Sequence, residues 1–171
     1  MAVDTLDNLL VQELKDLYSA ENQITRALPK LIKATSSDDL RGAFEHHLKE
    51  TEGHVKRLEK IFQILGSSPR GKTCNGMKGV LEEGAEVLEE IEEGNVRDAA
   101  LISAAQRVEH YEMAGYGTVR SYADCLGQPE ISQLLEETLE EEKAADQKLT
   151  KISQKLNSEA QHGAHAQHAG R

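Results

Sequence analysis

Aromatic residues and cysteine are scarce in this chain of 171 residues. It has no tryptophan, four tyrosines and two phenylalanines, which make 4% of the sequence aromatic, and only two cysteines. Cys74 and Cys125 do not form a CxxC motif, and we interpret them as buried thiols or, alternatively, as a redox pair. The cysteine ligands of a structural zinc site are therefore missing.

Long apolar runs and an excess of basic residues are also absent. No segment approaches the roughly 18 consecutive apolar residues of a transmembrane helix, and the N-terminus MAVDTLDNLL lacks the basic flank and apolar run of a signal peptide. We therefore expect a cytoplasmic protein with no membrane partner. The formal net charge of −10 argues against nucleic acid as a partner, because phosphate binding requires a basic surface.

The chain does have a helical periodicity of apolar residues, which predicts an all-α fold. The four long periodic segments span about residues 3–34, 37–65, 96–125 and 129–156. The first two and the last two are joined by short connections, so each pair should form an antiparallel hairpin. A shorter amphipathic segment at 76–93 lies between the hairpins. We predict an antiparallel four-helix bundle with this extra helix in the crossover between helices two and three.

Two features modify the ends and the interior of these helices. Pro29 lies within the first segment, where we expect a kink rather than an end because the apolar spacing continues beyond it. Residues 158–171 are small and polar and contain three histidines, so we predict a disordered tail there. The bundle would then occupy residues 1–157 as one domain.

Charged residues interrupt the apolar stripe of each long helix. They are Glu21 on the first, Glu50 and His54 on the second, Glu109 and Glu112 on the third, and Glu142 and Asp146 on the fourth. A buried carboxylate costs several kcal/mol unless it is paired, protonated or bound to a cation. The hairpins should bring Glu21 level with Glu50, and Glu112 level with Glu142. Any single acid could lie at a helix edge with its carboxylate in water, but matched depth on four helices favours one buried site.

A buried cluster of carboxylates with an imidazole indicates a metal centre. This set of ligands suits two iron ions or, alternatively, manganese ions. The predicted metal ligands are Glu21, Glu50, His54, Glu109, Glu112, Glu142 and Asp146. Catalytic residues cannot be assigned from the sequence.

Four motifs resemble one known family. They are DLYSAENQITRALPKL, HLKETEGHVKRLEKIF, RDAALISAAQRVEHYEMAGYGT and LLEETLEEEKAADQKLTKI. In order and spacing, over about residues 4–156, they are similar to the YciF/YciE family of ferritin-like, stress-associated proteins. The resemblance implies a ferritin-like bundle with a carboxylate-bridged di-iron centre, and a homodimer.

The resemblance also assigns ligands by position. It matches Glu21, Glu50, His54, Glu109, Glu112 and Glu142 to the metal ligands of the wider ferritin-like group. Two departures stand out: helix two has its Glu and His four residues apart rather than three, and Asp146 stands where a second histidine is expected. The second metal would then have fewer imidazole ligands or be held more weakly. His47 and His110 are candidates for contacting the ligands.

Two functions are consistent with such a centre. A di-iron site can react with O₂ or peroxide, which would make the chain a ferroxidase-like or peroxide-scavenging protein of the stress response. Alternatively, it is a metal-binding structural or stress protein without turnover. Tyr18, Tyr111 and Tyr116 should lie near the depth of the site, as packing residues or, alternatively, as radical or proton donors.

Overall fold

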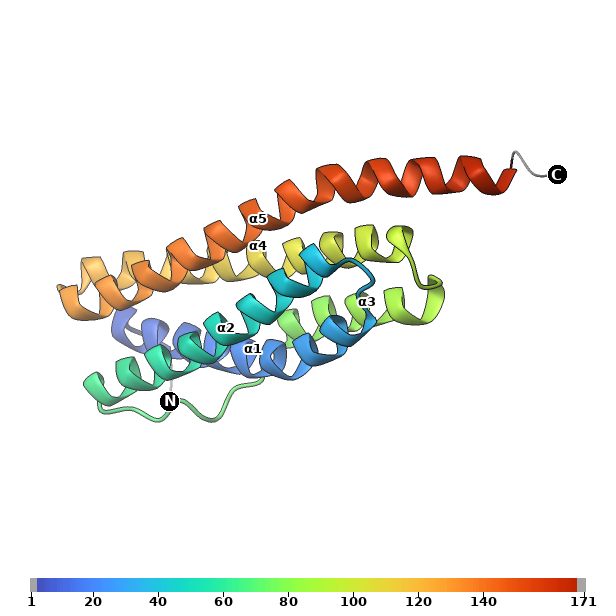
Figure 1. The fold of residues 1–171 in the computed structure, drawn as a ribbon. Helices are drawn as coiled ribbons and strands as arrows, with labels where there is room; N and C mark the ends of the chain where they lie inside the picture. Colours follow the sequence, from blue (N-terminus) through green and yellow to red (C-terminus); the bar gives the residue numbers. More distant parts are fainter. Residues whose placement is uncertain (1–2, 169–171) are drawn as a thin grey trace.

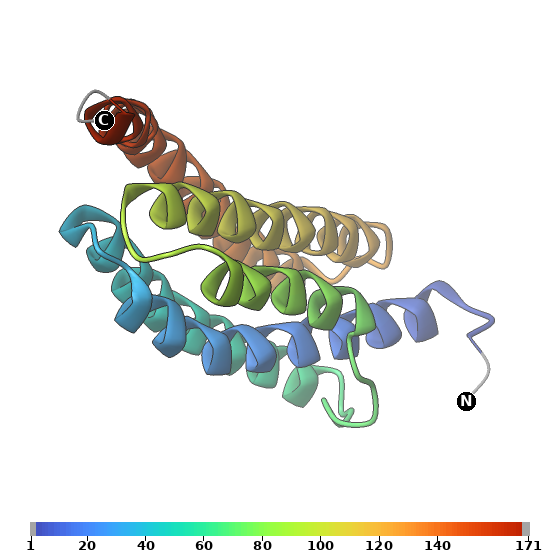
Figure 2. The same cartoon turned by 90° about the vertical axis from the view of Figure 1, so that its right-hand side faces the viewer.

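A computed structural model describes residues 3–168, and the side chains of residues 3–162. Its helices are α1 (Leu6–Ala34), α2 (Asp38–Ile64), α3 (Asn75–Glu90), α4 (Asn95–Cys125) and α5 (Pro129–His168). The described residues contain no strand. Figure 1 shows α1 and α2 as one antiparallel pair and α4 and α5 as another. Figure 2 shows α3 lying along α1 and α4. The predicted all-α four-helix bundle with a crossover helix is confirmed.

Short polar residues and glycines set the helix boundaries. The hydroxyl of Thr5 accepts a hydrogen bond from the backbone N–H of Asn8 at 3.1 Å, which caps α1. The hydroxyl of Ser37 accepts in the same way from Leu40 at the start of α2. Helix α4 starts after Gly94, whose φ of 140° suits glycine, and it has no side-chain cap there, although Asn95 is a residue type that favours this role.

Helix α1 ends where the sequence predicted, whereas α5 extends beyond its expected end. Helix α1 continues through Pro29, so the proline does not end it. Helix α5 was expected to end near Leu156, but it continues to His168, through most of the segment 158–171 that the sequence predicted as a disordered tail. Four of the fourteen residues in this segment are alanine, which has the highest helix propensity. Residues 169–171 lie outside the described residues.

A buried aspartate ties the two hairpins together. Asp98, near the start of α4, accepts hydrogen bonds from the backbone N–H groups of Ser36 (3.1 Å) and Ser37 (2.7 Å) in the turn between α1 and α2. The neighbouring Arg97 donates to the carbonyl of Ala34 at 3.0 Å. A buried charge is costly unless hydrogen bonds satisfy it, so these contacts hold the α1–α2 turn against α4.

The apolar core is divided into two clusters. The cluster nearer the α1–α2 turn contains Ala20, Ile24, Leu28, Leu40, Phe44, Cys74, Met77, Leu101, Ile102, Ala105, Val108, Leu149 and Leu156. The other contains Leu10, Leu14, Leu17, Leu58, Ile61, Phe62, Tyr116, Val119, Ala123, Ile131, Leu135 and Leu139. On α2, α4 and α5, buried charged residues lie between the two clusters, at His47 and His54, at Glu109 and Glu112, and at Glu142. A polar layer therefore crosses the middle of the bundle. In the part of the chain that the structure describes, none of the helices is long and apolar enough to cross a membrane.

Candidate metal centre

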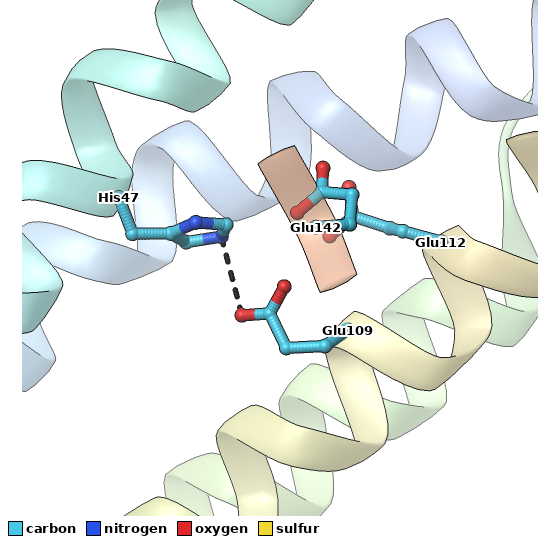
Figure 3. A group of neighbouring side chains, drawn as sticks. All are labelled: His47, Glu109, Glu112 and Glu142. Carbon is cyan, nitrogen blue, oxygen red and sulfur yellow. Dashed lines mark ion pairs between the residues drawn. The ribbon is translucent and has the colours of Figure 1, made fainter. Parts of the chain in front are cut away.

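The polar layer contains two overlapping groups of side chains that could bind a cation. In the first, His47, Glu109, Glu112 and Glu142 each offer one ligand atom, and these atoms all lie within 4.8 Å of one another. In the second, Glu21, His54 and Glu142 do the same. Figure 3 shows the first group, with its carboxylates and the His47 ring gathered from α2, α4 and α5. Because Glu142 belongs to both groups, they form one centre with two adjacent positions.

Distances within the centre are those of close polar contacts. His47 Nε2 lies 3.4 Å from Glu109 Oε1, the contact marked in Figure 3. His54 Nδ1 lies 2.9 Å from Glu142 Oε1 and 3.5 Å from Glu21 Oε1. One nitrogen of His54 therefore faces carboxylates from both α1 and α5.

Many polar atoms of the centre are buried without a hydrogen bond. They are Glu21 Oε2, both ring nitrogens of His47, His54 Nδ1, Glu109 Oε2, and both carboxylate oxygens of Glu112 and of Glu142. The nearest partner of His54 Nδ1 is Glu142 Oε1, at 2.9 Å. A buried polar atom without a partner costs about 1–3 kcal/mol. Four carboxylates and two imidazoles are a set of donors that suits the binding of a metal cation.

Without a cation, protons compensate for the clustered carboxylates. Burial raises the pKa values of Glu109 and Glu112 well above the ordinary range, and the nearby Glu142 carboxylate raises them further. Burial also acts to raise the pKa of Glu142, but the adjacent His54 outweighs it and lowers this pKa. Burial lowers the pKa of His54, but Glu142 and Glu21 outweigh it and raise the pKa to about 10. The metal-free centre thus holds a protonated imidazole and protonated acids.

A carboxylate and a guanidinium orient the His54 ring. Glu141 Oε2 lies 2.8 Å from His54 Nε2, on the side away from the centre. Arg57 donates to both oxygens of Glu141, at 2.8 and 3.2 Å, and to the hydroxyl of Thr138 at 2.6 Å. A hydrogen bond to one ring nitrogen of a histidine sets which nitrogen is free to bind a metal. The pair of Glu141 and Arg57 therefore presents Nδ1 of His54 to Glu21 and the neighbouring acids.

One of the three predicted tyrosines contacts the centre. The fully buried Tyr116 donates its hydroxyl hydrogen bond to Glu21 Oε1, and its ring lies 6.4 Å from the ring of His54. Tyr18 donates instead to Glu59 at 3.0 Å, and Tyr111 donates to Asp16 at 3.0 Å. Of these three tyrosines, Tyr116 is thus the one that donates a hydrogen bond to a carboxylate of the centre.

Glu50 lies beside the centre rather than in either group. Its carboxylate is 3.1 Å from His46 Nε2 and 3.8 Å from His47 Nδ1, and 23% of its side chain is exposed. Glu50 was expected to lie opposite Glu21, but His54 lies there instead. The pairing of α1 with α2 is therefore shifted by about one helical turn from the expected one. With His47 and Glu109, Glu50 lines a cavity of about 100 Å³ between α2 and α5. Its role as a ligand stays a prediction.

Asp146 also lies outside both groups. It accepts a hydrogen bond from Gln106 at 3.0 Å and lies 3.4 Å from His110 Nε2, with 20% of its side chain exposed. Its role as a ligand likewise stays a prediction. His47 was expected only to contact the ligands, yet it lies in the first group. Its position seven residues before His54, on the same helical stripe, was the signal in the sequence.

Fold and centre together define a class of protein. Four long helices enclosing a buried layer of carboxylates and imidazoles make this a ferritin-like bundle with a candidate metal site. The family described as a domain of unknown function (DUF892) matches residues 5–162, and the chain belongs to this family. It is also 47% identical to Protein YciF of Escherichia coli (strain K12) over 154 residues, which cover 90% of this chain and 93% of that protein.

Solved structures agree with this assignment. The crystal structure of the E. coli stress protein YciF is similar with a TM-score of 0.88 and 45% identity, covering 91% of this chain and 99% of that one. YcfI from Rhodopseudomonas palustris, described as a candidate structural protein, has a TM-score of 0.84 and 42% identity, over 88% and 97% of the two chains. A ferritin-like, diiron-carboxylate protein from Bacillus anthracis str. Ames has a TM-score of 0.68 at 16% identity, over 90% of this chain and 99% of that one, which shows the fold alone. The predicted YciF resemblance and ferritin-like fold are confirmed.

Proposed function

We propose that this chain is a di-iron carboxylate protein of the stress response that reacts with O₂ or peroxide, as a ferroxidase-like or peroxide-scavenging protein. The observation that carries the proposal is the buried layer of four carboxylates and two imidazoles, most of whose polar atoms lack hydrogen bonds. The description of the E. coli relative as a stress protein supports the proposed role in the stress response. Manganese is the alternative metal, and we propose a homodimer in the cytoplasm.

The shared carboxylate assigns the side chains to two positions. His47, Glu109 and Glu112 would hold one ion and Glu21 and His54 the other, with Glu142 belonging to both groups. Iron bound there would supply the electrons that reduce O₂ or peroxide. The chain's part would be to neutralise and position the ions with six buried side chains from four helices.

A hydrogen bond from a buried phenol is the second part of the chain's role. Burial and the nearby Glu21 carboxylate raise the pKa of the Tyr116 phenol well above its ordinary value, so the phenol keeps its proton at neutral pH. Its hydroxyl donates a hydrogen bond to Glu21 Oε1, and this contact would hold the Glu21 carboxylate in place at the edge of the centre. The cavity lined by Glu50 and His47 offers small polar reactants a path between α2 and α5.

A non-catalytic role is the second candidate. It is favoured by the likeness to YcfI, which is described as a candidate structural protein. In that role the centre would bind metal and join the four helices without turnover.

Anaerobic titration of the metal-free protein with Fe(II), followed by exposure to O₂ or peroxide, tests the proposal. We expect about two ions per chain and repeated consumption of oxidant when a reductant is present. The variant Glu142→Gln should lose both, whereas Glu140→Gln, an exposed acid on the same helix that pairs with Lys143, should keep both. Binding of iron with a single round of oxidation would support the structural role, and failure to bind metal would refute both.

A further inference from the structure

An apolar groove lies outside the metal centre, between α1, α3 and α4. Its volume is about 340 Å³, near the lower end of the roughly 300–1,000 Å³ typical of small-molecule sites. Small residues form its floor, among them Gly84 on α3 and Ala104 and Ala105 on α4. Leucines and valines from the three helices complete its walls. Helix α3 lies along α1 and α4 (Figure 2), and small residues line the groove where these helices meet.

Basic side chains surround the mouth of the groove. Arg26 and Lys30 on α1 and Lys78 on α3 line it, and all three are exposed. Glu82 is the acid among its lining residues, and it lies 3.6 Å from Lys78. Lys30 forms no ion pair among the described residues. In a chain with a net charge of −10, this local excess of positive charge marks the mouth as a site for an anionic group.

A smaller cavity beside the groove adjoins the metal centre. Its volume is about 20 Å³, and it is lined by the same Ala27, Leu31 and Leu81 that line the groove, and by His47 and Glu109 of the centre. The surroundings of a molecule in the groove would therefore change from basic at the surface to apolar along its length. That gradient matches a molecule with one anionic end and an apolar remainder.

We propose that this groove binds a small amphipathic carboxylate, with its alkyl chain between α1, α3 and α4 and its carboxylate beside Arg26, Lys30 and Lys78. The alkyl chain gains free energy by leaving water for the apolar walls, and the carboxylate keeps contact with cations and solvent. The inference does not depend on the proposed function, because no ligand of the metal centre takes part in binding. His47 does not line the groove itself but only the smaller cavity beside it.

Octanoate binding to the metal-free protein, measured by isothermal titration calorimetry, tests the proposal. We expect saturable binding of one octanoate per chain, and clearly weaker binding of octyltrimethylammonium, which has the opposite charge. The substitution Gly84→Leu fills the groove, since a Cβ added at Gly84 fits at 3.5 Å from the Ala104 Cβ and the rest of the side chain must extend into the space. Gly79→Leu is the matched control on α3, because a Cβ added there meets nothing within 4 Å.

Gly84→Leu should weaken octanoate binding by at least about tenfold, the effect of losing contact with two buried methylenes, and Gly79→Leu should leave it unchanged. If Gly84→Leu unfolds, Gly84→Ala serves in its place, with a smaller loss in the same direction. Lys30→Glu should also weaken binding, whereas Lys33→Glu, on the same helix outside the groove, should not. Equal binding by the Gly84 and Gly79 variants, or no saturable binding, would overturn the proposal. So would a change of oligomeric state in Gly84→Leu without octanoate binding, which would identify the groove as a contact with a second copy.

Discussion

Metal uptake by the centre should release a proton from His54. The pKa of this imidazole is raised to about 10 by Glu142 and Glu21 against the effect of burial, so at pH 7 the metal-free protein carries it as imidazolium. A metal binds only the neutral imidazole, and it is Nδ1 that faces the carboxylates of Glu21 and Glu142. The ion must therefore displace this proton.

The cost of that step follows from the gap between pH and pKa. Deprotonating a group at pH 7 with a pKa of about 10 costs roughly 4 kcal/mol, at about 1.4 kcal/mol per pH unit. Between pH 7 and pH 9, metal affinity should therefore rise about tenfold per pH unit for this proton alone. Burial and Glu142 also raise the pKa values of Glu109 and Glu112. At any pH where these acids are still protonated, metal binding must displace their protons too, which makes the metal affinity depend more steeply on pH.

Calorimetric titration in buffers of different ionisation enthalpy counts the protons released on binding. At saturating Fe(II) and pH 7, His54→Gln should release about one proton fewer than the unmodified protein. His162→Gln, an exposed residue outside the centre, should release the same number. An equal count for His54→Gln, or an affinity that does not change between pH 7 and pH 9, would refute the reasoning.

Three further predictions concern stability and positioning. The metal-free protein should melt at a lower temperature at pH 8.5 than at pH 5.5. Glu109 and Glu112 have raised pKa values in the folded protein, so they lower its stability as pH rises above their ordinary pKa of 4.5. The His54 imidazolium stabilises the folded protein, and this contribution is lost as pH rises from 6.5 towards 10. A melting temperature that does not fall would contradict this. Glu141→Gln should weaken metal binding about 10–100-fold in a competition titration, against no change for Glu140→Gln, because it loosens the ring that faces the metal. In urea denaturation, Gly115→Ala should have a free energy of unfolding roughly 1–3 kcal/mol lower than that of Gly117→Ala. A Cβ at position 115 would lie 2.7 Å from the buried Leu17 side chain, whereas a Cβ at position 117 meets nothing within 4 Å. Equal stabilities of the two variants would contradict this.

Periodicity was enough to predict the helices and the depth of most of the centre. Glu21, Glu109 and Glu142 were identified because each interrupts an apolar stripe at mid-helix, and side-chain position on a helix follows from residue spacing alone. The same argument placed Glu50 and Asp146 on these stripes, but both point partly to solvent. Their direction depends on how far each helix rotates against its neighbours, which spacing within one helix does not determine.

Contacts between helices account for what the sequence did not indicate. Glu141 is one of three consecutive glutamates, and its contacts with Nε2 of His54 and with Arg57 distinguish it from the other two. Glu21 lies opposite His54 rather than Glu50 because α1 and α2 are offset along their axes at the turn that joins them. Counting residues outward from the centre of the turn assumed no such offset. Such offsets are set by packing between helices that are distant in sequence.

The polar layer between the two apolar clusters has a consequence for how the protein unfolds. Each cluster is a separate body of buried side chains, and the layer that joins them lacks hydrogen bonds for many of its atoms. Local unfolding starts where the structure is held together most weakly, which without a cation is this layer. The backbone amides of the two halves should therefore undergo hydrogen exchange with different opening free energies. Ions held by the two groups, whose ligands together come from all four long helices, would join the halves into a single cooperative unit, because either half could open only by releasing an ion.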